Sequence, residues 1–198
     1  MTSPVIGVDP SAGKLALVCL MGDQAVMDTY VLGSPFTTAV PERAYACMSE
    51  FLQATTIDGI TPRVFMEAPV VAGARNIQST IKQAMVSGAL QTAVSEWGEP
   101  AVLVAVSSWK AGVGMGGNAG KQRVREWLAD AQPGLSTMCA YDQDLIDASC
   151  VALYGAELME RASGMDAMGA VQKPESPILH TTRVRSGVRR TERVQRTA

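Results

Sequence analysis

Histidine, cysteine and aromatic residues are scarce in this sequence. Its 198 residues include one histidine and four cysteines, and 5% of them are aromatic. Cys19, Cys47, Cys139 and Cys150 are scattered without a CxxC pair, and His180 lies in a polar C-terminal segment. We therefore expect neither a Cys/His zinc site nor a Ser-His or Cys-His catalytic pair. The thiols are expected to be reduced core residues. Any catalytic or binding site is therefore expected to use carboxylates, lysines or hydroxyls.

Long apolar runs are also missing. No stretch of 18 uncharged apolar residues occurs, so no membrane span is expected. The N-terminus, MTSPVIGVDP, has neither a basic segment nor a signal-peptide apolar region, which predicts a cytoplasmic protein. The hydrophobic content of 47% indicates a globular chain long enough to bury a core.

The charge is distributed unevenly along the chain. Residues 1–172 carry 10 Lys and Arg against 17 Asp and Glu, whereas residues 173–198 carry 7 against 2. The composition shifts from Ser163 onward to Gly, Ser, Pro, Thr and Arg. We predict one domain over 1–165 and a flexible basic tail over 166–198. The tail arginines would contact an anionic partner such as a DNA backbone, or would serve as a solubilising end.

The pattern of apolar residues predicts an alternation of strands and helices. Strands are expected at 4–9, 14–21, 25–32, 63–66 and 101–106, and helices at 41–53, 76–97, 119–131 and 141–162. A glycine-rich stretch, 107–120, and a connection, 133–140, separate the later elements. This order favours a mixed sheet, in which an antiparallel three-strand meander is extended by parallel strands reached through helices.

Four carboxylates occupy positions from which they can meet. Asp9 ends the first strand, Glu67 ends the Val64–Met66 strand, and Asp144 and Asp147 lie three residues apart on the last helix. Neighbouring parallel strands would present Asp9 and Glu67 side by side, and a helix crossing that edge would add the other two. Clustered carboxylates without histidine suit Mg²⁺ or Mn²⁺. Two such ions about 4 Å apart support phosphodiester hydrolysis.

Four segments, in this order, resemble motifs of the RuvC-type Holliday junction resolvases, which belong to the RNase H-like superfamily. They read IGVDPSAGKLALVCL, VFMEAPV, WKAGVGMGGNAGKQRVREWL and QDLIDASCVALYG. The first resembles the family's strand-borne Asp and turn, the second its strand ending in Glu, and the last its D-x-x-D-A helix. The resemblance spans about residues 4–160. It implies an α/β, RNase H-like fold with a mixed five-stranded sheet flanked by helices.

The resemblance also implies functional residues. The metal ligands and catalytic carboxylates would be Asp9, Glu67, Asp144 and Asp147, holding two Mg²⁺ or Mn²⁺ ions. Asp142 is a rival for Asp144, but the spacing to Asp147 and the following alanine favour Asp144. Lys121 would contact the scissile phosphate, unless it is an ordinary surface lysine at a helix start. The predicted DNA-binding residues are Arg75, Asn76, Lys110, Lys121 and Arg123.

The implied partners are branched DNA, such as a four-way junction, and a second copy of the chain, with neither a small-molecule cofactor nor a membrane. Helix 76–97 would form part of the dimer face. The best-known bacterial members carry an aromatic wedge in the loop after the catalytic Glu, whereas this chain has Val70, Val71 and Arg75 there. It is therefore more similar to phage or divergent resolvases, and a phage protein would act in the host cytoplasm.

Two other classes of function remain as alternatives. Actin-like phosphotransferases and sugar kinases also carry an Asp at the end of a first strand, but they need two such lobes and are much longer. A non-catalytic branched-DNA-binding protein of the same fold would have no need of four acidic residues. The formal GxGxxG match at 112–117 lacks the acidic strand end that a dinucleotide site requires.

Overall fold

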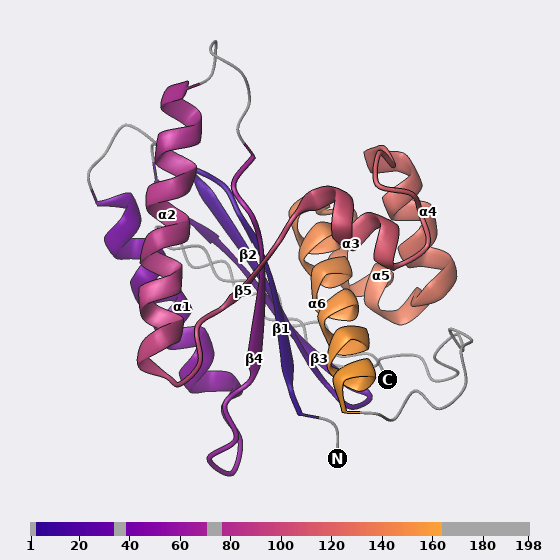
Figure 1. Ribbon diagram of the computed structural model, residues 1–198, viewed down its shortest axis with the longest axis horizontal. Coiled ribbons are helices and arrows are strands. Elements are labelled where there is room, and N and C mark those ends of the chain that lie inside the picture. Colours follow the sequence, from indigo (N-terminus) through magenta and orange to yellow (C-terminus); the bar gives the residue numbers. More distant parts are fainter. Residues whose placement is uncertain (1–2, 34–38, 71–76, 164–198) are drawn as a thin grey trace.

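The computed structural model describes residues 3–33, 39–70 and 77–163 (Figure 1). The strands are β1 (Val5–Pro10), β2 (Lys14–Met21), β3 (Gln24–Val31), β4 (Arg63–Glu67) and β5 (Val102–Val104). The helices are α1 (Val40–Thr55), α2 (Ile77–Glu96), α3 (Val106–Gly112), α4 (Lys121–Ala131), α5 (Pro133–Cys139) and α6 (Gln143–Ala162).

The strands form one mixed sheet in the order β3-β2-β1-β4-β5. β1, β2 and β3 pair antiparallel, whereas β4 pairs parallel with β1 and with β5. The β1–β2 turn is closed by Ser11, whose backbone N–H donates to the Lys14 carbonyl at 2.8 Å and whose hydroxyl accepts from the Lys14 N–H at 2.9 Å. The predicted five-stranded sheet, with its meander and parallel extension, is confirmed.

Helices cover both faces of the sheet. The apolar side chains of β1 alternate between the two faces, because successive residues of a strand point to opposite sides. Ile6 and Val8 join the core beneath α1 and α2, whereas Val5 joins the core shared with α6. Figure 1 shows α1 and α2 on one side of the sheet and α3 to α6 on the other.

Two glycines allow α6 to lie close to the sheet. A Cβ at Gly7 of β1 would overlap the Ala148 carbonyl and come within 2.8 Å of the Ala152 Cβ. A Cβ at Gly155 of α6 would overlap the ring of Phe65 on β4. The helix can therefore approach β1 and β4 closely only because these positions carry no side chain. The close packing of α6 on β1 and β4 determines where the N-terminus of α6 lies relative to the ends of both strands.

Several predicted elements were wrong in detail. The strand predicted at 101–106 shortens to β5, an edge strand whose Leu103 is 50% exposed. The glycine-rich stretch contains the helix α3, and the connection at 133–140 contains the helix α5. Both helices have seven residues, too few for apolar periodicity to reveal them. The other elements lie within a few residues of their predicted bounds.

Helical spacing predicts an apolar face on helix 76–97, and the structure buries the end of that face but not its beginning. The predicted residues are Ile77, Ile81, Met85, Ala89 and Val94, of which Val94 is buried. Ile77, Ile81 and Met85 are exposed, while the buried side of the helix carries Val86 and Leu90. Apolar residues occur on all sides of α2, so their periodicity alone does not predict which side packs on α1 and the sheet. The outward face is consequently rich in apolar side chains.

The remaining sequence predictions divide into those that the described residues test and those that lie outside them. All four cysteines are buried and free, as expected for core thiols. No helix in 3–33, 39–70 or 77–163 combines the length and apolarity needed to cross a membrane. The basic tail, most of the loop after Glu67, Arg75 and Asn76 lie outside the described residues.

Candidate active site

Asp9 and Glu67 lie next to each other at the carboxyl edge of two parallel strands. The last paired residues of β1 and β4 are Val8 and Met66, so Asp9 and Glu67 take the following positions on their strands. Val8 and Met66 both point to the α1/α2 side of the sheet. Strand alternation therefore directs Asp9 and Glu67 to the opposite side, beneath α6.

The α6 helix brings the other two carboxylates to the same edge. Asp144 lies in its first turn, and Asp147 follows one turn later on the same side. Asp142 is the N-cap of the helix, and its side chain accepts a hydrogen bond from the Asp144 N–H at 3.0 Å. Such a cap satisfies a backbone donor that has no partner within the helix. Asp142 therefore has a structural task as the N-cap of α6. The choice of Asp144 over Asp142 as the site residue stays a prediction.

Electrostatic interactions connect all four carboxylates. Burial raises the pKa of Asp9 well above its ordinary value, and the charges of Glu67, Asp147 and Asp144 raise it further, against a smaller opposing effect of Lys14. Burial likewise raises the pKa values of Glu67 and Asp147, and Asp147 adds to the effect on Glu67. Like charges in a partly buried site disfavour ionisation. At neutral pH this acidic cluster costs free energy that a cation would offset.

Lys14 supports the cluster from β2. Its Nζ pairs with Asp144 Oδ2 at 2.8 Å and with the two Asp142 carboxylate oxygens at 2.8 and 2.9 Å. Burial acts to lower the pKa of Lys14, but the hydrogen bonds to Asp142 and Asp144 raise it overall. Lys14 thus joins the β1–β2 turn to the start of α6.

Glu67 and Asp147 have supporting residues of their own. The Trp109 indole N–H donates to Glu67 Oε2 at 3.0 Å. The Gln143 amide donates to Asp147 Oδ1 at 2.8 Å, and Arg125 Nε donates to the Gln143 oxygen at 2.7 Å. The Trp109 hydrogen bond lowers the pKa of Glu67, and the Gln143 hydrogen bond lowers the pKa of Asp147, each against a larger effect of burial.

Sequence reasoning missed the supporting roles of Lys14, Trp109 and Gln143. Lys14 and Asp142 are 128 residues apart in the sequence. Trp109 and Glu67 are 42 residues apart. A local sequence pattern therefore cannot predict either contact. Gln143 directly precedes Asp144, and its four-residue spacing to Asp147 is a signal that could have been noticed.

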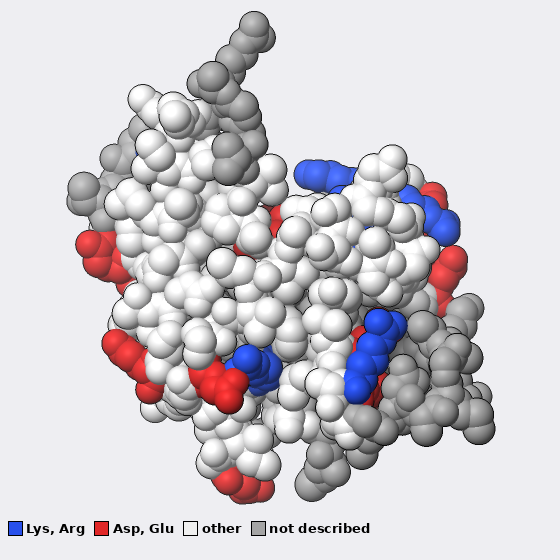
Figure 2. Space-filling view, viewed as in Figure 1, with Lys and Arg blue, Asp and Glu red and all other residues white. Residues whose placement is uncertain are grey.

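Three of the predicted DNA-binding residues lie within the described chain. Lys110 lies in the last turn of α3, is half-buried, and donates to the Ala119 carbonyl at 2.7 Å. Its charge lowers the pKa values of Glu67 and Asp147, and that of Lys121 lowers the pKa of Asp147. Lys121 and Arg123 are exposed in the first turn of α4. Figure 2 shows acidic atoms deep in the hollow between the α2 side and the α3/α4 side, where basic groups lie nearby.

The donor chemistry of this edge fits a hard divalent cation, because every candidate ligand is a carboxylate oxygen. Within 3–33, 39–70 and 77–163, however, no three Asp, Glu, Cys or His side chains converge closely enough to hold a metal ion as they stand. Asp144 is engaged by Lys14 and Glu67 by Trp109. The four carboxylates are thus coupled by charge but not gathered around one point.

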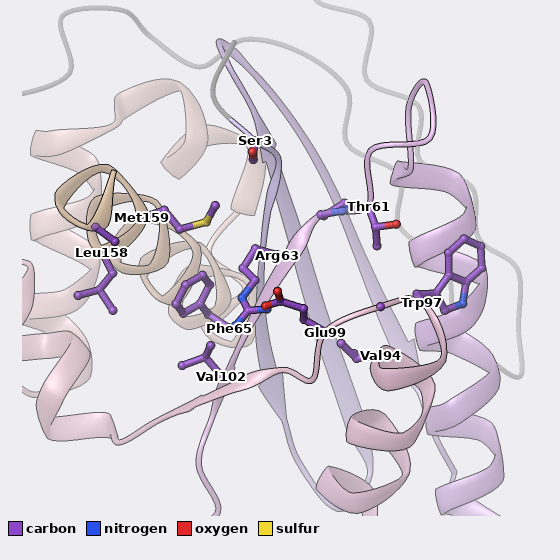
Figure 3. A pocket seen from close by; sticks show the side chains of 13 residues that line it. Ser3, Thr61, Arg63, Phe65, Val94, Trp97, Glu99, Val102, Leu158 and Met159 are labelled. Atoms are coloured by element: carbon purple, nitrogen blue, oxygen red, sulfur yellow. The ribbon is translucent and has the colours of Figure 1, made fainter. Parts of the chain in front are cut away.

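A cavity of about 740 Å³ lies at the other end of β4 (Figure 3). Its walls come mainly from apolar side chains, among them Phe65, Trp97, Leu158 and Met159. Its charged groups, Arg63 and Glu99, form an ion pair with each other. None of the four carboxylates of the acidic cluster borders this cavity.

This fold is similar to that of solved RuvC-type Holliday junction resolvases. A structure titled T. thermophilus RuvC in complex with Holliday junction substrate matches with a TM-score of 0.62 and 20% identity, over 81% of this chain and 97% of that one. A second Thermus thermophilus RuvC structure gives a TM-score of 0.56 and 18% identity, over 81% of this chain and 96% of the other.

The yeast mitochondrial Holliday junction resolvase Ydc2 is similar as well. It matches with a TM-score of 0.51 and 12% identity, over 82% of this chain and 81% of its own. No protein-family model matches the sequence, and no curated protein matches it. The likeness is therefore one of fold, retained at low sequence identity.

Proposed function

We propose that this protein is a metal-dependent endonuclease that cuts four-way or other branched DNA. The observation that carries the proposal is the setting of Asp9, whose pKa is raised by burial and by three further carboxylates at one edge of a RuvC-type fold. An acidic cluster of this kind is costly without a cation. The similarity to a RuvC structure with Holliday junction substrate supports a branched DNA as the substrate.

Asp9, Glu67, Asp144 and Asp147 would hold Mg²⁺ or Mn²⁺, two ions in each site. Divalent cations supply charge stabilisation and an activated water for phosphodiester hydrolysis. Asp9 is coupled by charge to the other three carboxylates, so its carboxylate would be a principal ligand. Trp109 and Gln143 hold Glu67 and Asp147, while Lys110 and Lys121 lie close enough to affect the charges of the site. Cleavage would leave 5′-phosphate and 3′-hydroxyl ends.

A nicking assay tests this function. Wild-type protein with Mg²⁺ should nick a synthetic four-way junction in preference to a linear duplex, with a flapped duplex as the third substrate. Asp9→Asn should reduce cleavage by about a thousandfold, the scale of several kcal/mol of lost metal-ion catalysis, while junction binding persists. Asp23→Asn, at an exposed turn residue, is the matched control and should retain full activity. If Asp9→Asn cut at the wild-type rate, the site assignment would be wrong.

We also propose that two copies of the chain associate through α2. Its outward face carries Ile77, Ile81 and Met85, which are 62%, 53% and 53% exposed, and the neighbouring Ala84 and Gly88 are small. A row of exposed apolar side chains on one helix marks an interaction surface. A two-fold dimer would bury this face against itself and supply two active sites for paired nicks.

Sedimentation of the 20.9 kDa chain tests the dimer. Wild-type protein should sediment at twice the chain mass, and Ile81→Glu should sediment as a monomer because a charge is unfavourable in a buried apolar interface. Ile60→Glu, at a residue outside α2 that is 52% exposed, should leave the dimer intact. A monomeric wild-type protein at micromolar concentration would rule out this dimer.

A further inference from the structure

Trp109 has one polar atom, and that atom is used at the acidic cluster. The residue lies in α3, its side chain is 0% exposed, and its Nε1 lies 3.0 Å from Glu67 Oε2. A buried indole N–H needs an acceptor, and an ionised carboxylate is a stronger one than a neutral oxygen. The core therefore contains a bulky apolar ring whose only donor points at a candidate metal ligand.

The indole ring is held firmly from several sides. It belongs to the core cluster that also contains Val104, Leu145 and Ile146, from β5 and α6. The Trp109 backbone N–H donates to the Ala105 carbonyl at 3.2 Å, and the Trp109 carbonyl accepts from Val113 N–H at 3.0 Å. Lys110 Nζ lies 5.4 Å from the centroid of the ring. Because the Trp109 indole N–H is held in one place, it can hold the Glu67 carboxylate to which it donates.

We propose that Trp109 is a positioning residue for Glu67, and this inference rests on the proposed metal-dependent function. The indole N–H holds Oε2 of a side chain with three rotatable bonds, and so restricts the orientation of the Glu67 carboxylate at the acidic edge. A ligand already oriented loses less side-chain entropy when a cation binds. Removing such an outer hydrogen bond from a metal ligand typically costs about 10–100-fold in metal affinity.

The indole N–H signals in a ¹⁵N–¹H spectrum provide a direct test. The chain has three tryptophans, so each signal can be assigned from the substitutions Trp97→Phe, Trp109→Phe and Trp127→Phe. We expect the Trp109 signal to move in Glu67→Gln, which replaces a charged acceptor by a neutral one, while the other two signals stay in place. Mg²⁺ added to the wild-type protein should move the same signal. Trp97→Phe and Trp127→Phe already assign the Trp109 signal by elimination, so the test does not depend on whether Trp109→Phe folds.

Metal affinity provides the second readout. Trp109→Phe keeps an aromatic ring but removes the donor, and we expect it to weaken Mg²⁺ binding by about 10–100-fold in calorimetric titration. Trp127→Phe is the matched control, because Trp127 is half-buried against the same core and should leave the affinity unchanged. A role in packing alone would lower the melting temperature of both variants without this difference in affinity.

The outcomes separate the two proposals. A Trp109 signal that Glu67→Gln leaves in place, or unchanged Mg²⁺ affinity in Trp109→Phe, overturns the positioning role and leaves the nuclease proposal standing. A wild-type protein that binds neither Mg²⁺ nor Mn²⁺ overturns the metal-dependent function and, with it, the role of Trp109 toward a cation.

Discussion

The two ends of β4 carry charged residues in opposite circumstances. At the start of the strand, Arg63 pairs with Glu99, whose side chain is 77% exposed, beside a cavity of about 740 Å³. At its end, Glu67 meets other carboxylates under α6, and burial raises its pKa. The first end has an apolar cavity and a balanced ion pair. The second has an excess of negative charge held in place by donors from other elements.

This difference between the two ends of β4 indicates which of them is the candidate functional site. A large apolar cavity is a common default for a ligand site, but here its charged groups already satisfy each other. Titratable groups with perturbed pKa values, coupled to one another, are better indicators of a functional site. On that criterion the carboxyl end of β4 is the candidate site.

The largest effect is expected from a methyl group added between β1 and α6. Gly7→Ala would place a Cβ against the Ala148 carbonyl and the backbone nitrogen of Ala152, atoms that cannot move without shifting the helix. We expect a loss of at least about 1–3 kcal/mol of stability. The melting temperature should fall by about 2–4 °C for each kcal/mol, as measured by calorimetry.

Gly120→Ala is the control for this substitution. A Cβ at Gly120 would meet no atom within 4 Å, so the expected change is that of an altered helix N-cap, about 1 kcal/mol or less. Equal melting temperatures of Gly7→Ala and Gly120→Ala would contradict the close packing of α6 on β1.

A smaller effect is expected from neutralising one acid at each end of the strand. The folded state raises the pKa of Glu67, so it binds a proton more readily than the unfolded chain does. Metal-free stability must therefore fall as the pH rises through the interval between the unfolded and folded pKa values. Glu67→Gln should raise the melting temperature in EDTA at pH 7, by about 2–4 °C for each kcal/mol of penalty removed. The gain should vanish below about pH 4.

Glu99→Gln provides the comparison at the other end. Glu99 is mostly exposed and paired with Arg63, and such pairs contribute about 0–1 kcal/mol. We expect no gain in melting temperature at pH 7 from this substitution. Equal responses of the two variants would mean that the ends of β4 do not differ in charge balance.

Much of the fold and of the acidic cluster could be predicted from local sequence. Short apolar runs that end in Asp9 and Glu67 identify strand ends, and the three-residue spacing of Asp144 and Asp147 identifies one side of a helix. The parallel pairing of β1 and β4 then follows from the order of the elements. The metal-ligand roles of these residues stay a prediction.

The supports of the cluster could not be predicted, because they depend on contacts between distant segments. Lys14 reads as an ordinary strand-start lysine, yet it bridges Asp142 and Asp144. Trp109 reads as part of a glycine-rich stretch, yet it lies in a helix and is fully buried. Only the packing of α3 and α6 against the sheet brings these side chains to the acidic edge.

The most direct test of the central claim is the effect of Mg²⁺ on the thermal unfolding of the wild-type protein and Asp9→Asn. If the acidic cluster is a cation site, Mg²⁺ should stabilise the wild-type protein, by about 2.7 kcal/mol at one hundred times its dissociation constant. Asp9→Asn should gain nothing from Mg²⁺, and in EDTA at pH 7 it should melt above the wild-type protein, because one of the four mutually repelling charges is gone. A wild-type protein whose unfolding is unchanged by Mg²⁺ and Mn²⁺, or an equal gain in Asp9→Asn, would contradict the account.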